Sequence, residues 1–421
     1  MPASTRSLTA THIHQFVHDH CFKPGFEGWV GVELELLTTR TNEPLVRPEL
    51  DELLAVMATV EPPQGSRITL EPGGQMELSS RPCPGPATAV AATSTDLDVL
   101  RTGLGVGGIT TGAVGLDFVR PYRRVLRGGR YDAMEAYFDT SGDTAGRAMM
   151  CATASTQVNL DLGEEDVLTR RWHLAHALGP VLIASFANSP LAAGRPTGAK
   201  SSRQQIWAAL DPTRSAPVLT DYGPRSIGPA EAWARYAMAA RVMLIRSSPQ
   251  LFQPVGTALT FASWMANGHE LGYPTLDDFA YHLGTLFPPV RPKGWLELRM
   301  IDALPDPWWQ VAVAVTAALL DDPAALGTAE RTCRPIAGLW SEAASFGLDH
   351  PGLASAAGTC FAAALDALPR LGVSGALLAS TADYADRYVD RRRTPGDDLL
   401  DAWLAAPDPA LLTSGYAPAP R

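Results

Sequence analysis

The sequence predicts an α+β fold, and three observations lead to this prediction. Segments that alternate polar and apolar residues, as half-buried strands do, lie in the front and middle of the chain. Long helical segments lie between and after them, instead of alternating one by one with the strands as in βαβ units. The 421 residues, 46% of them hydrophobic, suffice for two average domains or one large body. We expect a single domain over residues 1–421.

The elements of the first half follow from residue periodicity and turn chemistry. Residues 28–39 alternate like a half-buried strand, and residues 66–71 and 75–80 are predicted to form a hairpin. Its turn, Pro72-Gly73-Gly74, supplies the positive-φ positions of a tight reversal. In chain order we expect a helix over 4–22, the strand 28–39, the hairpin, a helix over 87–104 and a strand over 107–116.

The second half is predicted to be mostly helical. One short strand interrupts the later helices, and the end of the chain is rich in alanine and leucine. In chain order we expect a strand over 152–162, a helix over 165–186, a Pro/Gly-rich loop over 188–198, a helix over 201–210, a strand over 295–301, and a helical C-terminal region over 321–421 with a frayed tail at 414–421.

The composition disfavours several classes of protein. A net charge of −10 disfavours a nucleic-acid partner, because binding to a phosphate backbone needs a basic surface. No run of about 18 uncharged apolar residues predicts a membrane span, and the N-terminus lacks the apolar segment of a secretory signal. The five cysteines are dispersed without a CxxC pair, which indicates a reducing cytoplasm rather than a disulfide framework or zinc site.

Three familiar motifs are present only in form. Residues 103–108 fit GxGxxG, but a predicted helix precedes them and a strand follows, the reverse of the dinucleotide-binding order. Residues 194–201 nearly spell a P-loop, but Lys200 is displaced by one position and no strand precedes the glycines. His14 and His18 lie four apart on a predicted helix without the glutamate that completes HExxH. We therefore expect a plain loop at the second motif and a solvated or core-edge helix face at the third.

Four strand segments carry carboxylates, amides or a guanidinium at every second residue. Glu33 and Glu35, for example, share one face of their strand, with apolar residues on the other. One such strand alone is more often the wet face of an antiparallel sheet, but four together indicate a binding site. The residues are Glu33 and Glu35; Glu71, Gln75, Glu77 and Ser79; Gln157, Asn159 and Asp161; and Glu297 and Arg299.

Carboxylates gathered on one sheet repel each other unless a positive charge lies among them. Mg²⁺ prefers such oxygen ligands and is usually shared with substrate phosphates. Only three of the 34 basic residues are lysines, so arginines would have to hold anionic substrates, bidentately where geometry allows. The pattern predicts a metal–phosphate site. The candidate arginines are Arg130, Arg203, Arg214, Arg291 and Arg299.

Several segments resemble the glutamate–cysteine ligase family of the plant and bacterial type, in the carboxylate–amine ligase group related to glutamine synthetase. Order and approximate spacing agree over about residues 25–320, and QVNLD, ANSP and FPPVRPKGWLELR are the most specific. Beyond residue 320 only helical character is shared. The segments are GVELELL (31–37), EPGGQMELSS (71–80), GRYDAM (129–134), TQVNLD (156–161), FANSP (186–190), SSRQQIW (201–207), DPTR (211–214) and HLGTLFPPVRPKGWLELRMID (282–302).

The resemblance implies a bowl-shaped, mainly antiparallel sheet that holds ATP and two or three Mg²⁺ ions, with glutamate and cysteine at its mouth. The implied reaction forms an acyl phosphate from the γ-carboxylate of glutamate, which the amine of cysteine then attacks. The chain also resembles the branch that supplies ergothioneine synthesis. Supply for glutathione and a different amine acceptor remain alternatives. The implied protein is a cytoplasmic monomer or weak homo-oligomer without nucleic-acid or membrane partners.

The resemblance also implies a role for each matching position. Arg203, in the family's S-x-R-x-x-I-W motif, would grip the α-carboxylate of glutamate beside Trp207. Arg130 would contact cysteine or the transferring phosphate, and Arg299 would stabilise charge on the phosphoryl group. The other implied roles are metal ligands for Glu33, Glu35, Glu77 and Glu297, a metal or substrate-orienting role for Glu71, metal or nucleotide contacts for Gln157 and Asn159, and a nucleotide contact for Arg214.

A non-catalytic metabolite-binding protein with the same bowl is the alternative from another class. Loss of an acid would be its mark, yet all four predicted metal ligands are present. A costly cluster of acids is seldom kept without its ion, so we favour the enzyme. The regulatory thiols of the plant enzymes do not map onto these five cysteines, which leaves redox control open.

Overall fold

The strand β1 (Trp29–Arg40) organises the central sheet of the computed structural model. Residues 8–25, 28–140, 142, 144–219, 227–248, 250–256 and 258–413 are described, and within them this sheet has eight strands. Its strands pair antiparallel along the path β11-β12-β6-β1-β3-β2, and β4 and β5 also pair antiparallel with β1. The predicted antiparallel sheet is therefore confirmed. The other strands are β2 (Arg67–Leu70), β3 (Met76–Ser79), β4 (Cys83–Pro84), β5 (Ile109–Gly112), β6 (Ser155–Asp161), β11 (Val290–Pro292) and β12 (Trp295–Asp302).

The register of the sheet places polar residues of neighbouring strands side by side on one face. Since successive side chains alternate between faces, the apolar Val32, Leu34 and Val158 point to the opposite face, where they are buried. One face is thus core and the other carries the chemistry. The facing polar pairs are Glu35 with Glu77, Glu33 with Gln157, and Glu297 with Asn159.

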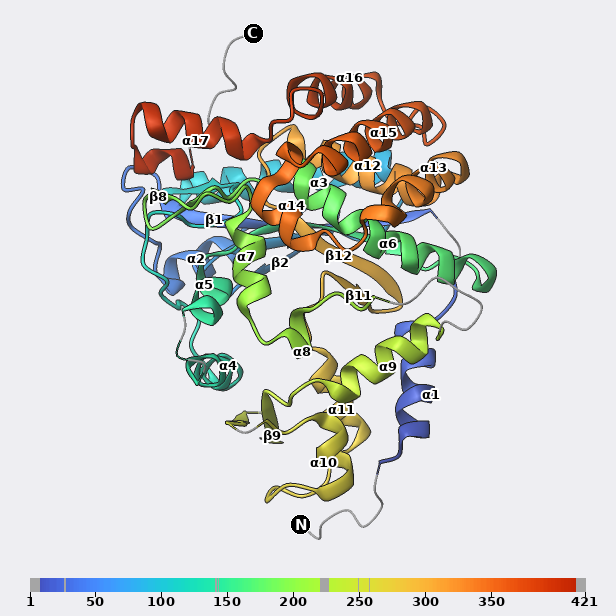
Figure 1. The fold of residues 1–421 in the computed structure, drawn as a ribbon. Helices are drawn as coiled ribbons and strands as arrows, with labels where there is room; N and C mark the ends of the chain where they lie inside the picture. Colours follow the sequence, from blue (N-terminus) through green and yellow to red (C-terminus); the bar gives the residue numbers. More distant parts are fainter. Residues whose placement is uncertain are drawn as a thin grey trace.

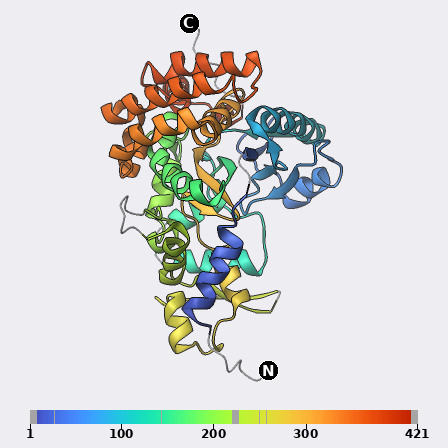
Figure 2. The same ribbon diagram turned by 90° about the vertical axis from the view of Figure 1, so that its right-hand side faces the viewer.

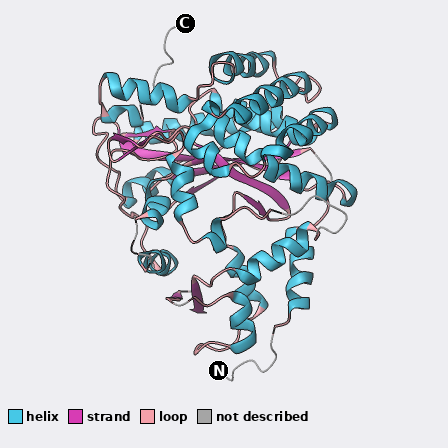
Figure 3. Cartoon of the chain, viewed as in Figure 1, coloured by secondary structure: helices cyan, strands magenta, loops and turns pink. Residues whose placement is uncertain are grey.

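Helices cover the apolar face of the sheet. α3 (Gly85–Val106) contacts β1, α6 (Glu165–Ser185) contacts β12, and α12 (Trp308–Asp321) contacts β6. The remaining C-terminal helices, orange to red in Figure 1, lie beyond them, so the sheet is backed by a thick helical layer (Figures 1 and 3). They are α13 (Pro323–Cys333), α14 (Trp340–Phe346), α15 (Pro351–Ala367), α16 (Gly375–Tyr384) and α17 (Pro395–Ala405), with the short η1 (Arg334–Ile336), η2 (Gly347–Asp349), η3 (Ala385–Val389) and η4 (Pro409–Leu412).

A second group of helices lies on the other side of the sheet. α1 (Ala10–Cys21) packs against α9 (Pro229–Ala239) and α11 (Leu276–Leu283), although the first two are far apart in sequence (Figures 1 and 2). This group forms the rim opposite the polar face of the sheet (Figure 1). The other members are α10 (Phe261–Asn267), the hairpin β9 (Leu244–Ser248) and β10 (Leu251–Pro254), α4 (Gly129–Asp139), α5 (Ala145–Ala152), α7 (Ser202–Ala209) and α8 (Pro212–Ser215), while α2 (Leu50–Met57) follows β1.

Most predicted elements are confirmed within a few residues, whereas the helices α2, α4 and α5 and several short strands were not predicted. The strand expected over 107–116 is only β5, and the one expected over 152–162 begins after the end of α5. The loop expected over 188–198 contains a two-residue hairpin, β7 (Leu191–Ala192) and β8 (Arg195–Pro196). The strands β9, β10 and β11 were not predicted, because three to five residues carry too little periodicity. Residues 1–7 of the first helix and the tail 414–421 lie outside the described residues.

The motifs set aside above have ordinary positions. Residues 103–108 end α3 and turn into β5, so this GxGxxG opens no helix. Residues 194–201 include β8 and end at Ser201, whose hydroxyl caps α7. No single helix in the described ranges is long and apolar enough to cross a membrane, although α12 and α13, bent by 95° at their junction, reach that length and composition together.

Candidate active site

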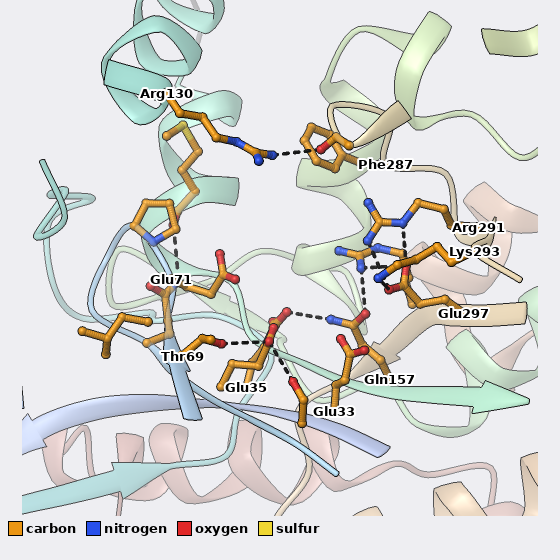
Figure 4. A pocket seen from close by; sticks show the side chains of 18 of the residues that line it. Glu33, Glu35, Thr69, Glu71, Arg130, Gln157, Phe287, Arg291, Lys293 and Glu297 are labelled. Carbon is orange, nitrogen blue, oxygen red and sulfur yellow. Dashed lines mark hydrogen bonds and ion pairs between the residues drawn. The ribbon is translucent and has the colours of Figure 1, made fainter. Parts of the chain in front are cut away.

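A cavity of about 1010 Å³ lies over the polar face of the sheet. Strands β1, β2, β3, β6, β11 and β12 form its floor, while α4, α5 and α11 contribute to the opposite side. Figure 4 shows side chains from these separate elements pointing into one space. Its lining includes the predicted Glu33, Glu35, Glu71, Glu77, Arg130, Gln157, Trp207, Arg291, Glu297 and Arg299.

One wall of the cavity, the acidic wall, is formed by Glu33, Glu35, Glu71 and Glu77. Hydrogen bonds from neutral groups hold these carboxylates. Asn159 Nδ2 donates to Glu33 Oε1 at 2.9 Å, and the two oxygens of Glu35 accept from Ser155 N at 2.7 Å and Gln157 Nε2 at 2.8 Å. Glu77 Oε1 accepts from the hydroxyls of Thr69 and Ser79, each at 3.0 Å.

The acidic wall carries more negative charge than its neighbours neutralise. Burial, followed by the nearby Glu35 and Glu77 carboxylates, raises the pKa of Glu71 to about 8. Burial and neighbouring glutamates likewise raise the pKa of Glu33 and that of Glu77. Raised pKa values of clustered acids mark a place where a cation would be stabilised.

The donor set of the acidic wall fits a hard cation such as Mg²⁺, because it consists of carboxylate oxygens that keep free lone pairs. Their present positions are not those of a closed metal cage. Across the described residues, no three His, Cys, Asp or Glu side chains are grouped as ready metal ligands. The hydrogen bonds from Gln157 and Asn159 hold two of the acids in their current orientations.

The other wall, the cationic cluster, consists of Arg291, Lys293 and Arg299 around the fully buried Glu297. Arg291 donates from Nε to Oε2 at 2.6 Å and from Nη2 to Oε1 at 3.1 Å. Lys293 Nζ reaches Oε1 and Arg299 Nη1 reaches Oε2, both at 3.1 Å. Burial alone would raise the pKa of Glu297, but these three cations lower it far below its usual range. The cluster keeps a net positive charge.

Gln157 joins the two walls. Its amide nitrogen donates to Glu35, and its carbonyl oxygen accepts from Arg299 Nη1 at 2.7 Å. Because its amide donates from the nitrogen and accepts at the oxygen, Gln157 bridges the two walls and fixes their relative position. The cavity is therefore bipolar, with carboxylates in excess on one side and cations on the other.

Comparison with known proteins decides the family. The pattern of the glutamate–cysteine ligase family 2 (GCS2) matches residues 29–409. The chain belongs to this family. It is 46% identical over 382 residues to the glutamate–cysteine ligase EgtA of Mycolicibacterium smegmatis, covering 90% of this chain and 88% of that protein. It is 39% identical over 397 residues to EgtA of Mycobacterium tuberculosis H37Rv, covering 93% and 90%.

A solved structure shares the fold at low sequence identity. The glutamate–cysteine ligase of Francisella tularensis, crystallised in complex with AMP, superposes with a TM-score of 0.51 at 11% identity, covering 93% of this chain and 87% of that chain. Such a likeness supports the fold only. The expectation of a family fold built on an antiparallel sheet with surrounding helices is confirmed.

Two family positions at the cavity lie where the sequence predicted them. Arg130 lines the cavity from α4, donates Nη2 to Gly284 O at 2.9 Å and lies over the ring of Tyr281, 5.5 Å from its centroid. Trp207 lines it from α7 and packs edge-on against Phe287, with ring centroids 5.8 Å apart. The Trp207 ring also lies 5.9 Å from the Arg299 guanidinium carbon, so it borders the cationic wall.

Arg203 lies behind the large cavity and not on its wall. Its side chain is buried, with the guanidinium 5.8 Å from the Trp207 ring centroid, and its Nη2 donates to Arg299 O at 2.9 Å. It lines a second, largely apolar cavity of about 250 Å³, which shares Trp207, Phe287 and Arg299 with the first. Arg203 Nε has no hydrogen-bond acceptor among the described residues.

Two residues predicted to contact the metal or nucleotide, Arg214 and Asn159, line neither cavity. Arg214 is fully buried and donates to Thr285 O at 2.8 Å, Arg241 O at 2.6 Å and the Tyr137 hydroxyl at 3.2 Å. Its two terminal nitrogens bind buried oxygens, and Nε lies 3.4 Å from Asp211 Oδ2, so Arg214 anchors the fold in this structure, away from both cavities. Asn159 is also absent from the lining of both cavities and acts on the site through its bond to Glu33.

Sequence reasoning gave no role to Lys293, which the structure places in the cationic cluster. Lys293 lies in the turn between β11 and β12, and Arg291 faces Glu297 directly across that hairpin. The signal was present in R-P-K-G-W-L-E, where Pro and Gly mark a turn that brings the basic and acidic residues together. Glu297 was predicted as a metal ligand, and the structure instead surrounds it with three cations.

Proposed function

We propose that this protein is an ATP-dependent glutamate–cysteine ligase. A γ-carboxylate oxygen of glutamate attacks the γ-phosphorus of ATP, which gives γ-glutamyl phosphate and ADP. The amine of cysteine then attacks the acyl carbon, phosphate leaves, one proton is lost and γ-glutamylcysteine is formed. The family match and the 46% identity to an EgtA ligase support this activity. The observation that carries the proposal is the single bipolar cavity.

The bipolar cavity matches the electrostatic problem of the first step. A carboxylate and a triphosphate repel each other, and the repulsion grows where water is excluded. Cations held in fixed positions lower this barrier without reorganising during the reaction. In this chain Arg291 and Arg299 offer such fixed charges on one wall. The more exposed Lys293 adds a third cation there, and Arg130 adds another from the opposite rim.

Mg²⁺ is the cation that we infer for the acidic wall. When bound there, it would neutralise triphosphate charge and help to hold the phosphates in line for transfer. Glu33, Glu35 and Glu77 offer the oxygens, with Glu71 adjacent, while Gln157 and Asn159 orient two of these acids through existing hydrogen bonds. Two or three ions remain the prediction.

Arg299 is the residue that we infer stabilises the transferring phosphoryl group. Glu297 and Gln157 both hold its Nη1, so the guanidinium is kept in place before substrates arrive. Burial opposes its charge, but the neighbouring Glu297, Glu35 and Glu33 raise the pKa of Arg299, so it stays cationic at every working pH. Proteins catalyse phosphoryl transfer mainly by positioning the reacting groups and stabilising their charge.

Arg203 is proposed to hold the α-carboxylate of glutamate. Its free Nε and its place behind Trp207 suit a substrate that passes Trp207 toward the smaller cavity. The γ-carboxylate would then remain in the large cavity beside Arg299, which lines both spaces. This arrangement puts the two ends of glutamate on either side of one indole ring.

Supply of γ-glutamylcysteine for ergothioneine synthesis is the branch that we propose, because two relatives of nearly full coverage carry the name EgtA. The same product would serve glutathione synthesis, and the chemistry of the site is identical for both. Cytoplasmic location and a monomeric or weakly associating state remain predictions.

The decisive assay is ADP release with glutamate and ATP, with and without the acceptor amine. We expect release to depend on cysteine, to be weaker with 2-aminobutyrate and weakest with serine, and to need Mg²⁺. Mass spectrometry should identify γ-glutamylcysteine as the product. A preference for another amine would show that the acceptor is not cysteine. Absence of ADP release with every amine would refute the ligase assignment.

A further inference from the structure

Glu297 is saturated with cationic donors. A carboxylate offers about two lone pairs on each oxygen. Oε1 accepts from Arg291 Nη2 and Lys293 Nζ, while Oε2 accepts from Arg291 Nε and Arg299 Nη1. All four positions are taken, so Glu297 in this arrangement offers no lone pair to a metal ion.

The acidic wall differs in this respect. Among the described residues Glu33 accepts one hydrogen bond and Glu35 two, in each case from neutral donors. These carboxylates keep lone pairs free for a cation, and giving up a neutral donor costs less than giving up a charged one. Glu297 can therefore join a metal site only after one of its cations has moved.

Lys293 is the cation best able to move. Its side chain is 40% exposed, compared with 15% for Arg291 and 14% for Arg299. Apart from Glu297, its contact among the described residues is the face of Trp295, 5.2 Å from Nζ to the ring centroid. Arg291 holds Glu297 with two nitrogens, and Arg299 is also held by Gln157.

An anion in the cavity would compete with Glu297 for the ammonium group of Lys293. The cluster carries three cations against one carboxylate, and it faces a cavity large enough for a nucleotide. A triphosphate brings several negative charges and many acceptor oxygens, so it competes strongly with one carboxylate for a flexible ammonium. Lys293 also lies in the turn Pro292-Lys293-Gly294, where Gly294 has a φ of +83°. Its four-carbon chain can swing without moving β12.

We propose that Lys293 is a phosphate-binding residue that leaves Glu297 when the triphosphate enters, and that Glu297 thereby becomes available to Mg²⁺. Nucleotide binding and completion of the metal site are then coupled through one carboxylate. This inference rests on the proposed function, because it takes ATP as the ligand of the cavity. It also reconciles the expected metal role of Glu297 with its present partners.

The experiment measures binding without metal and without turnover. A β,γ-imido analogue of ATP is titrated into the protein in EDTA by calorimetry. Lys293→Met should weaken binding about tenfold, the size of one lost charge-assisted contact. Glu297→Gln should tighten it severalfold, since the competing carboxylate is gone. Lys23→Met removes an exposed lysine that does not line the cavity and should leave the affinity unchanged.

A second titration uses Mn²⁺ without nucleotide, read by electron paramagnetic resonance. Lys293→Met should bind Mn²⁺ severalfold more tightly than the unaltered protein, because Glu297 has regained a lone pair. Equal analogue affinity of Lys293→Met and the unaltered protein, or weaker metal-free binding in a folded Glu297→Gln, would overturn the inference. Should Glu297→Gln fail to fold, the two Lys293→Met titrations decide. An unaltered protein that binds the analogue neither in EDTA nor in the presence of Mg²⁺ would overturn the proposed function as well.

Discussion

The two walls of the cavity differ in how far their charges are satisfied before any substrate is present. On the cationic side, Glu297 has a cation at every lone pair. On the acidic side, Glu33 and Glu35 have only neutral donors, and the pKa of Glu71 rises to about 8. Charge is therefore kept apart within one cavity. The acidic wall favours an added cation, whereas the cationic wall favours an added polyanion.

The largest effect, a fall in kcat, is expected when a carboxylate of the acidic wall is neutralised. Glu33→Gln keeps the shape of the side chain but removes the charge, so kcat should fall on the order of 10³-fold through loss of metal-assisted charge stabilisation. Steady-state ADP release measures this. Glu61→Gln removes an exposed glutamate outside the cavity and serves as the matched control. Activity close to normal in a folded Glu33→Gln protein would take this residue out of the metal site.

The next effect concerns Arg203, which lines the smaller cavity and is proposed to hold glutamate. Arg203→Ala should raise the KM for glutamate roughly 10- to 100-fold, since a charge-assisted carboxylate contact is lost. The KM for ATP should change little. Arg203→Lys should recover part of the loss, because it restores the charge but not the fork. An unchanged glutamate KM in Arg203→Ala would refute the assigned contact.

The third prediction concerns Arg214, which lines neither cavity. Because its donors bind buried oxygens and do not reach the cavity, Arg214→Met should lower the free energy of unfolding by about 3 kcal/mol. The KM for ATP should stay within about twofold of normal. Urea unfolding and steady-state kinetics supply the two numbers. A large rise in the KM for ATP without loss of stability would restore the nucleotide role.

The smallest effect is a pH dependence of stability from the acidic wall. The folded-state pKa of Glu71 lies near 8, above its usual 4.5, so the folded protein binds more protons than the unfolded chain between these values. The free energy of unfolding should then fall as pH rises through this window. Glu71→Gln should raise Tm by a few degrees at pH 8 and by nothing near pH 4, measured by calorimetry. Equal Tm values at pH 8 would contradict the raised pKa.

Local patterns of the sequence predicted the floor of the site well. Alternation on one strand places Glu33 and Glu35 on one face wherever that strand lies, and the same holds for Gln157 with Asn159. The convergence of four segments followed from the fact that one sheet can hold them all. The resemblance to the ligase family then supplied the implied chemistry and the position of Arg130.

Long-range packing set what the sequence did not predict. Arg203 and Arg214 both lie in family motifs, yet Arg203 lines the smaller cavity and Arg214 lines neither. Their positions depend on how α7 packs against α5 and α14, and α8 against α9. The partners of Glu297 depend on the hairpin register of β11, a strand of three residues with no periodic signal. Strand alternation predicts the face of the sheet on which a side chain lies, but it does not predict which residue of another strand that side chain contacts.

The most direct measurement of the bipolar cavity is the location of both ligands in crystals grown with Mn²⁺ and ADP. Anomalous scattering should place Mn²⁺ beside Glu33, Glu35 and Glu77, with the phosphates between the metal and the cluster of Arg291, Lys293 and Arg299. Metal and nucleotide bound elsewhere, or phosphates lying away from the cationic cluster, would contradict the account.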